Sequence, residues 1–371
     1  MSNAKMTEFS SGSTAPEKGS ALSRATVQRD DEYRQGYLAA LVSRGEAKAA
    51  IDEIIASGLL DSRRKVLTRQ NLVEIPVKGP LFSYRTVVQL HPVFFRRSPE
   101  LADLMKSEMK PEEIELLPRG WFILGDIIIV KIQPQLDRFK HKIGEALLSI
   151  YPRCRSVLRD FGIEGQLREP VREIIAGVSS ETIHRENGVL FKLDALRVMF
   201  SQGNLRERMR MSLLGREETV VDMFAGIGYF SLPMAVHSRP RKVLAIELNP
   251  VAFGYLKENV RLNHVESIVE PLLGDCEKLT PSGVADRVVM GYVGETDRYL
   301  EAGVQALRPG GVLHYHQTVP SWQYPTAAIK DVVEATEKLG RRVEILNCAR
   351  VKKYSPGVVH AVVDARIGRD D

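Results

Sequence analysis

Short apolar runs recur through the second half of the chain, and each lies next to a glycine or an acidic residue. VVDMFAGIGYFS (220–231) contains the first run, and AIELNP (245–250) contains the second. LLGD (272–275), ADRVVMG (285–291) and GGVLHYH (310–316) predict three further strands, with helices between them. An antiparallel pair, 341–351 and 358–366, follows around a Ser-Pro-Gly turn. This alternation predicts a mostly parallel, doubly wound α/β sheet.

The turn after the first strand has the features of a ligand-binding loop. Gly226 and Gly228 permit positive φ and let the backbone approach a ligand closely. Dinucleotide-binding folds place a third glycine three residues later, where a pyrophosphate sits on the helix N-terminus. Ser231 occupies that position here. The turn therefore favours S-adenosylmethionine, which has an adenosine but no pyrophosphate.

Carboxylates lie at the ends of three predicted strands. Glu247 ends the second strand, where a carboxylate accepts hydrogen bonds from both ribose hydroxyls of such a ligand. Asp275 follows the third strand, at a position from which it accepts from an adenine amino group. Asp286 opens the fourth strand, and we expect that strand to end at the reaction centre.

The composition changes along the chain and predicts three parts. Residues 1–30 are rich in Ser, Gly, Thr and Ala, which predicts a disordered tail. Residues 31–178 predict a smaller N-terminal α/β domain, and 179–371 predict the catalytic domain. A hairpin over 182–194, with an Asn-Gly turn, joins the two domains.

Charge and cysteine content limit the partners and the compartment. The net charge of +5 is compatible with a polyanionic partner such as RNA. Three widely spaced cysteines form no metal pattern, and no apolar run has membrane-spanning length, so we expect a cytoplasmic protein. Basic residues of the N-terminal domain are candidates for phosphate contact, with a solvated surface charge as the alternative for each: Arg96, Arg97, Arg119, Arg138, Lys140, Lys142, Arg153 and Arg155.

Two segments resemble motifs of one enzyme family. FSQGNLRERMR (200–210) and KKYSPGVVH (352–360) resemble segments shared by the tRNA guanosine N1-methyltransferases that act next to the anticodon and their relatives in wybutosine synthesis. The resemblance runs from about residue 47 to the C-terminus. It implies a class I methyltransferase-like (Rossmann-type) fold, S-adenosylmethionine as co-substrate and tRNA-Phe as partner. We expect a monomer with no metal and no membrane association.

The segment after the fourth strand distinguishes two branches of this family. The methyltransferase branch carries an Asn-Pro-Pro or Asn-Leu-Pro motif that grips the target base, whereas this chain has MGYVGET (290–296). Together with HYH (314–316), that segment resembles the archaeal aminocarboxypropyl transferases. Those enzymes attach the 3-amino-3-carboxypropyl group of S-adenosylmethionine to C7 of 4-demethylwyosine. The alternative is methyl transfer to guanosine N1 at the same position.

The resemblance also implies the cofactor-binding residues. Ser201 and Arg208 contact the methionine portion, and Arg208 pairs with its carboxylate. Arg206 and Arg210 are alternatives for that pairing, and an ion pair with Glu207 or another acid is the alternative role for Arg208. The other positions surround the ribose, the adenine and the glycine turn: Asp222, Phe224, Gly226, Gly228, Glu247, Leu248, Asp275, Cys276 and Gly291.

The transferred group depends on how the ligand is positioned. The sulfonium has three electrophilic carbons, and presenting the methionine Cγ in place of the methyl releases 5′-methylthioadenosine. The target base must leave its stack to reach the pocket, and Tyr292 is a candidate to stack on it. Asp286, His314 and His316 are candidates to remove the proton from the attacked carbon, although each has a structural alternative.

Two other classes of protein share parts of this pattern. A nicotinamide-dependent oxidoreductase uses a similar sheet, and Ser231 in place of glycine counts against it. An RNA-binding module with a vestigial cofactor fold is the second alternative. The intact set Asp222, Gly226, Gly228, Glu247 and Asp275 counts against that alternative.

Overall fold

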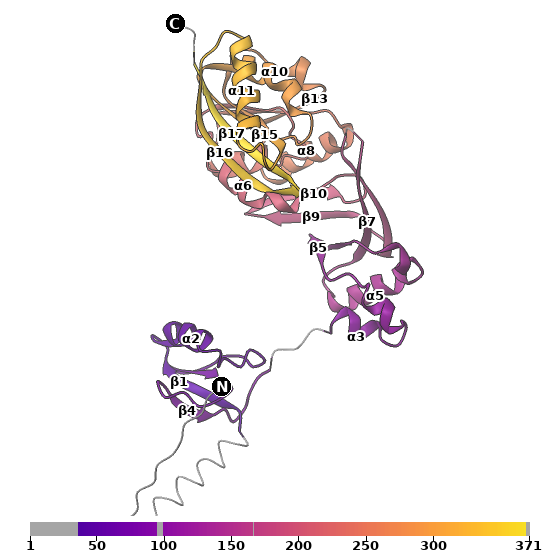
Figure 1. Ribbon diagram of the computed structural model, residues 1–371, viewed down its shortest axis with the longest axis vertical. Coiled ribbons are helices and arrows are strands. Elements are labelled where there is room, and N and C mark those ends of the chain that lie inside the picture. Colours follow the sequence, from indigo (N-terminus) through magenta and orange to yellow (C-terminus); the bar gives the residue numbers. More distant parts are fainter. Residues whose placement is uncertain (1–35, 95–98, 166, 369–371) are drawn as a thin grey trace, which may run out of the picture. The chain divides into compact units, whose positions relative to one another are not determined.

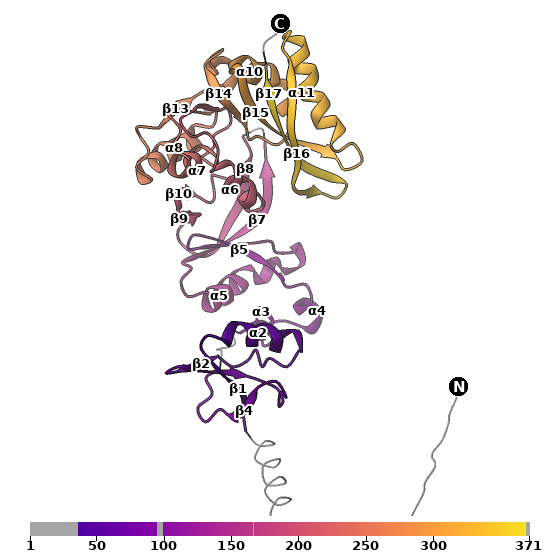
Figure 2. The same cartoon turned by 90° about the vertical axis from the view of Figure 1, so that its left-hand side faces the viewer.

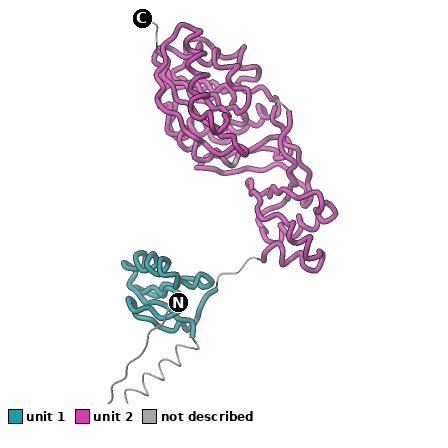
Figure 3. The backbone as a smooth tube through the Cα atoms, viewed as in Figure 1, with its two compact units in different colours: residues 1–98 teal, residues 99–371 magenta. Residues whose placement is uncertain are grey.

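The computed structural model describes residues 36–94, 99–165 and 167–368. The predicted disordered tail, 1–30, lies outside this range, as do Arg96 and Arg97. The chain divides after Ser98 into two compact units, which Figure 3 shows in different colours.

The division differs from the predicted N-terminal domain, 31–178. Residues from 99 onward belong to the second unit together with the predicted catalytic domain. Leu124, Ile127 and Leu158 share one hydrophobic core with Phe191 and with apolar residues of the large sheet. The apolar pattern along a strand does not say which core that strand joins.

The first unit is a small antiparallel sheet with one helix. The strands lie in the order β2-β3-β1-β4, and β1 pairs with both β3 and β4. Apolar residues of β1 and β3 pack with Ile54 of the helix, which is fully buried. The elements are β1 (Leu38–Ser43), α2 (Ala47–Ala56), β2 (Leu67–Arg69), β3 (Leu72–Pro76) and β4 (Arg85–Val88).

The second unit begins with two short helices and a four-stranded sheet of order β5-β6-β7-β8. The aliphatic run over β6 is buried along its whole length, and α5 packs on β7 and β8. Figure 1 shows α3 and α5 beside this sheet. The elements are α3 (Leu101–Met105), α4 (Pro111–Ile114), β5 (Trp121–Leu124), β6 (Ile127–Val130), η1 (Pro134–Phe139), α5 (Lys140–Ile150), β7 (Ser156–Glu164) and β8 (Glu169–Gly177).

The predicted hairpin is confirmed as β9 (Glu181–Glu186) and β10 (Val189–Asp194). Its turn residues Asn187 and Gly188 have φ of 46° and 79°, the left-handed region that an Asn-Gly turn requires. The side chains of Asn259 and Asn263 bond the backbone of β10, so the hairpin is fixed against the helix that carries them.

A seven-stranded sheet forms the main layer, in the order β13-β12-β11-β14-β15-β17-β16. Strands β11 to β15 are parallel, and β17 runs antiparallel to β15 and β16, which confirms the doubly wound sheet and its closing pair. The strands are β11 (Thr219–Asp222), β12 (Lys242–Glu247), β13 (Val269–Leu273), β14 (Ala285–Met290), β15 (Leu307–Pro320), β16 (Val343–Ser355) and β17 (Val358–Ile367).

Helices connect these strands, and Figure 2 shows α8 near β13 and α11 near the opposite edge. Two hydrophobic cores lie in this part, one with α8 and one with α10 and α11. Within the described residues, no helix is long and apolar enough to cross a membrane. The helices are η2 (Gln202–Asn204), α6 (Leu205–Met211), α7 (Ser231–His237), α8 (Pro250–Leu262), α9 (Cys276–Leu279), η3 (Thr296–Tyr299), α10 (Leu300–Ala306) and α11 (Thr326–Lys338).

Candidate cofactor and acceptor site

A cavity opens where β11, β12 and β14 end. Parallel α/β sheets bind ligands at this edge, because the loops that follow the strands leave a crevice there. Nine of the predicted site residues line this cavity: Ser201, Arg208, Phe224, Gly226, Glu247, Leu248, Asp275, Cys276 and Gly291. They come from six separate places along the chain, and the fold brings them together.

The glycine turn is built as its sequence suggests. Gly226 and Gly228 have φ of 58° and 103°. A Cβ at Gly226 would come within 2.4 Å of the Tyr229 ring, so only glycine fits without a shift. Gly228 and Asp222 do not line the cavity, and Asp222 instead accepts from Ser231 Oγ at 2.6 Å behind the turn. Burial raises the pKa of Asp222 to about 6.

Glu247 stands at the end of β12 and closes the glycine turn. Its Oε2 accepts from the Gly226 N–H and its Oε1 from the Asn249 N–H, both at 2.7 Å. Burial raises the pKa of this carboxyl group, and the backbone N–H groups oppose that shift. A carboxylate has about four lone-pair sites, so two remain for ligand hydroxyl groups.

Aromatic and acidic residues line another part of the cavity. Phe224 stacks on Tyr292 with centroids 5.3 Å apart, and Tyr299 meets Phe224 edge-on. Asp275 caps α9 by accepting from the Glu277 N–H at 3.0 Å. Burial raises the pKa of the Cys276 thiol to about 12, so this cysteine stays protonated at neutral pH and is no nucleophile.

Arg208 lines the cavity, but its charge is already paired. The guanidinium donates to both carboxylate oxygens of Glu186, at 2.6 and 2.7 Å, and to the Ser201 carbonyl at 2.8 Å. The pairing acid is therefore Glu186 on β9, whereas Arg210 pairs with Glu207 and Asp364. Arg206 is exposed and does not line the cavity.

Four further cations line the cavity and were not predicted: Arg197 and Arg298, which are exposed, and Arg168 and Lys352, which are half-buried. Lys352 of β16 donates to Ser201 Oγ at 3.1 Å, and Arg168 donates to the Val293 carbonyl at 2.9 Å. Lys352 is the first residue of the KKYSPGVVH segment, which carries the family resemblance. That resemblance was the only indication in the sequence that Lys352 belongs to the site. Arg168 lies in the loop between β7 and β8, and no pattern in the sequence indicated that it lines a cavity.

Asp286 lies away from the cavity, at the amino end of β14. It accepts from the Thr219 N–H at 2.7 Å and pairs with Arg308 and Arg241. Since β14 approaches the cavity only at its carboxyl end, its first residues cannot reach a ligand there. This placement gives Asp286 a structural role and does not support the predicted catalytic one.

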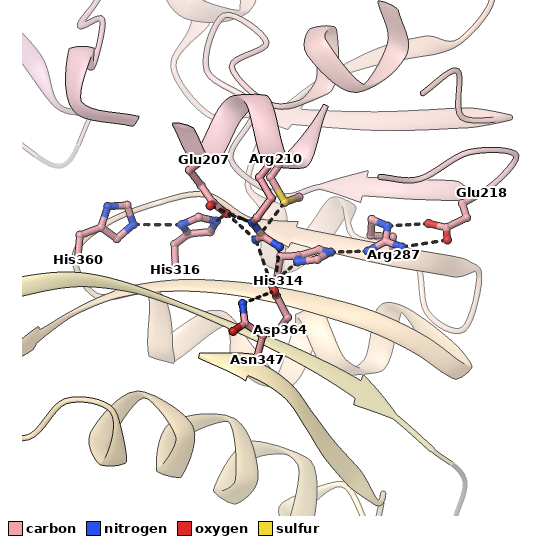
Figure 4. A network of polar contacts seen from close by, with 10 residues as sticks. Glu207, Arg210, Glu218, Arg287, His314, His316, Asn347, His360 and Asp364 are labelled. Carbon is pink, nitrogen blue, oxygen red and sulfur yellow. Dashed lines mark hydrogen bonds and ion pairs between the residues drawn. The ribbon is translucent and has the colours of Figure 1, made fainter. Parts of the chain in front are cut away.

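His314 does not line the cavity either. It is buried, with Nδ1 2.6 Å from Asp364 Oδ1 and Nε2 against Arg287. Figure 4 shows the polar network that includes it, between α6 and the face of β15 and β17. A histidine held on both sides by charged partners is a packing element, so the prediction of His314 as a base is not supported.

The same network contains a histidine pair. His316 Nδ1 lies 3.1 Å from His360 Nε2, and His316 Nε2 lies 3.7 Å from Glu207 Oε1 (Figure 4). The second ring nitrogen of each histidine is buried and makes no hydrogen bond within the described residues. Burial lowers the pKa of both rings to about 3. His316 also packs on the cavity-lining Phe230, with centroids 5.3 Å apart, so the pair supports the cavity wall from behind.

Four of the six described basic residues that were predicted to contact phosphates are charge-paired. Arg138 pairs with Glu113, Lys140 with Glu173, Lys142 with Glu108 and Arg155 with Asp126. These four cations are thus less available to phosphates than their number suggests.

The glycine turn, the acidic strand ends and the mixed seven-stranded sheet define the class of S-adenosylmethionine-dependent transferases with a class I methyltransferase fold. Residues 182–346 match the TRM5/TYW2 methyltransferase domain, and residues 101–181 match the TYW2 N-terminal domain. The chain belongs to the TRM5/TYW2 family.

Three relatives illustrate this membership. The chain is 37% identical over 270 residues to the tRNA(Phe) (4-demethylwyosine(37)-C(7)) aminocarboxypropyltransferase of Pyrococcus horikoshii, covering 72% of this chain and 96% of that one. The crystal structure of P. horikoshii TYW2 in complex with MeSAdo is similar at a TM-score of 0.66, with 36% identity and coverage of 73% and 98%. Trm5b of Pyrococcus abyssi, a tRNA (guanine(37)-N(1))-methyltransferase, is 32% identical over 89% of this chain and 99% of its own.

Proposed function

We propose that this protein transfers the 3-amino-3-carboxypropyl group of S-adenosylmethionine to C7 of 4-demethylwyosine, 3′ of the anticodon of tRNA-Phe, and releases 5′-methylthioadenosine. The main support for this proposal is that one cavity is lined by two groups of residues. Glu247, Asp275 and the Gly226 turn suit the adenosine, and Ser201 with its neighbouring cations suits the methionine portion. The archaeal TYW2 relatives and the absence of an Asn-Pro motif after β14 support the same branch.

The residues of this chain act by binding and orienting. Glu247 holds the ribose, Asp275 with Cys276 borders the adenine, and Phe224 and Leu248 form apolar walls beside it. Ser201 and Arg208 lie near the methionine portion. S-adenosylmethionine supplies an electrophilic Cγ next to its sulfonium, so the chain needs no covalent nucleophile. The buried, protonated Cys276 agrees with that requirement.

The acceptor base reaches the cavity from the side of Tyr292. Tyr292 lines the cavity, stacks on Phe224 and lies 6.0 Å from the Arg168 guanidinium. Aromatic rings and guanidinium planes are the usual stacking surfaces for an unstacked RNA base. We propose that Tyr292 borders the flipped purine. Transfer forms the bond between C7 and Cγ, breaks the bond between Cγ and sulfur to release 5′-methylthioadenosine, and releases the C7 proton to water. The ring of Tyr292 contributes by orienting the base for this step.

The first unit lies outside both matched family regions, which begin at residue 101. The Trm5b relative covers 89% of the chain, whereas the P. horikoshii aminocarboxypropyltransferase covers 72%. We propose that the N-terminal part of the chain contacts tRNA-Phe. We further propose that the protein acts as a cytoplasmic monomer, without a metal ion.

The longer match to Trm5b makes methyl transfer to guanosine N1 the second candidate. One experiment separates the two. The protein is incubated with S-adenosylmethionine and tRNA-Phe from a strain blocked before side-chain addition, and the small-molecule product is identified by mass. We expect 5′-methylthioadenosine, and tRNA-Phe with an unmodified guanosine at that position serves as the control acceptor. S-adenosylhomocysteine formed with the control tRNA would instead identify a methyltransferase.

A further inference from the structure

The charges around the cavity are unevenly balanced. Glu186 neutralises Arg208 through two hydrogen bonds, as described above. Lys352 and Arg168 are half-buried, and their hydrogen bonds go to the neutral Ser201 Oγ and Val293 carbonyl, with no ion pair to a carboxylate of the described residues. Arg197 also lines the cavity, but it is exposed, so water solvates its charge. A half-buried cation is costly unless an anion compensates it. The cavity is therefore built to receive a negative charge beside Lys352 and Arg168.

The position of Lys352 is fixed by its surroundings. Its Nζ donates to Ser201 Oγ, and a Cβ at Gly203 would come within 2.7 Å of Lys352 Cδ. The aliphatic part of the Lys352 side chain therefore packs directly on the backbone of Gly203, where a side chain would displace it. Burial and the neighbouring Arg168 and Arg208 lower the pKa of its ammonium, and no acid is near enough to oppose that shift.

An acceptor atom lies in the same part of the cavity. Asn204 lines the cavity, and its Oδ1 is buried without a hydrogen-bond partner among the described residues. Buried polar atoms are nearly always paired, so an unpaired carbonyl oxygen in a ligand cavity indicates a donor on the ligand. Two half-buried cations without an ion pair and one free acceptor together match a zwitterion, whereas a phosphate would satisfy only the cations.

We propose that Lys352 and Arg168 bind the α-carboxylate of the cofactor's amino acid arm and that Asn204 Oδ1 accepts from its α-ammonium. This assignment rests on the proposed function and deepens it. It replaces Arg208 as the carboxylate partner, and Arg208 becomes the residue that positions Ser201 through its carbonyl. Holding both charged ends of the arm fixes the direction of Cγ relative to the acceptor base, so these residues act as positioning residues for the transferred group.

The test is a double-mutant cycle between protein and ligand, measured by calorimetry without tRNA. Wild-type protein and the Lys352→Met variant are each titrated with S-adenosylmethionine and with decarboxylated S-adenosylmethionine, which lacks only the carboxylate. We expect Lys352→Met to weaken binding of S-adenosylmethionine about 10- to 100-fold, the range of one charge-assisted hydrogen bond. Binding of the decarboxylated ligand should change less than about 3-fold, because the partner group is already absent.

Matched controls keep the result interpretable. Lys353→Met removes the same charge from the exposed neighbouring residue, which does not line the cavity, and should leave both affinities unchanged. If Lys352→Met fails to fold, the wild-type comparison decides alone, since equal affinity for the two ligands shows that the carboxylate is not held. A loss of tRNA affinity with unchanged S-adenosylmethionine affinity would mean that Lys352 binds a phosphate, and it would also overturn the assignment. Wild-type protein that binds neither ligand would refute the proposed function itself.

Discussion

Replacing Glu247 tests the central contact of the proposed site. In the folded chain its two oxygens accept from the Gly226 and Asn249 N–H groups, at 2.7 Å each. Glu247→Ala removes these acceptors together with the lone pairs that we assign to the ribose hydroxyls. The substitution therefore affects the ligand directly and also the glycine turn that approaches it.

The expected size follows from the number and kind of hydrogen bonds. A hydrogen bond to a charged group contributes about 1.5–3 kcal/mol, and water replaces part of it at a half-buried site. We expect Glu247→Ala to weaken binding of S-adenosylmethionine by about 1–3 kcal/mol, or roughly 5- to 150-fold. Because burial raises the pKa of this carboxyl group, wild-type affinity should also begin to fall at a pH above the usual carboxyl range.

Calorimetry with wild-type protein and the variant gives the affinities directly. Glu266→Ala removes an exposed carboxylate elsewhere on the same unit and should leave the affinity unchanged. A thermal melt of each variant without ligand shows whether the turn itself has been lost. Equal affinity of wild-type protein and Glu247→Ala would remove this residue from the ribose site and refute the argument from strand-end carboxylates.

Two further predictions concern residues that the structure places away from the cavity. Asp286→Ala should lower the free energy of unfolding in urea by about 1–3 kcal/mol, because it removes the buried carboxylate that bonds the Thr219 N–H and pairs with two half-exposed arginines. Turnover per folded molecule should stay within about 2-fold of the wild-type value, because Asp286 does not line the cavity. A large loss of turnover at unchanged stability would restore its catalytic assignment. The pKa values of His316 and His360 are about 3 in the fold, whereas an imidazole in the unfolded chain has a pKa of about 6.5. The unfolded chain therefore binds protons first, and stability should fall as pH drops from 6.5 toward 3, by up to about 1.4 kcal/mol per pH unit for each ring. Replacing both with Gln should flatten that slope, and an unchanged slope would contradict the assignment.

Local chemistry made much of the site predictable. The Gly226 turn, the carboxylate of Glu247 and the acid at Asp275 are each set by a few neighbouring residues. A strand, a glycine turn and a helix that follow one another in the sequence are also neighbours in the fold, so their pattern predicts the local structure directly. The resemblance added Ser201 and Arg208, and both line the cavity.

Other features depended on which strands are neighbours. Asp286 begins the strand whose far end lines the cavity, and the face of β15 that carries His314 is covered by α6, so both residues are buried in ion pairs. A sequence pattern gives the alternation of faces along a strand, but it does not give the element that covers each face.

The sequence by itself determined the sheet, its parallel order of alternating strands and helices, and the acidic end of the ligand site. Only the tertiary structure decided that Glu186 neutralises Arg208 and that Lys352 reaches Ser201 across 151 positions of the chain. The physical reason is that turn geometry and periodicity are local properties. Charge balance in a cavity, in contrast, is a sum over side chains that come together only when the sheet has formed.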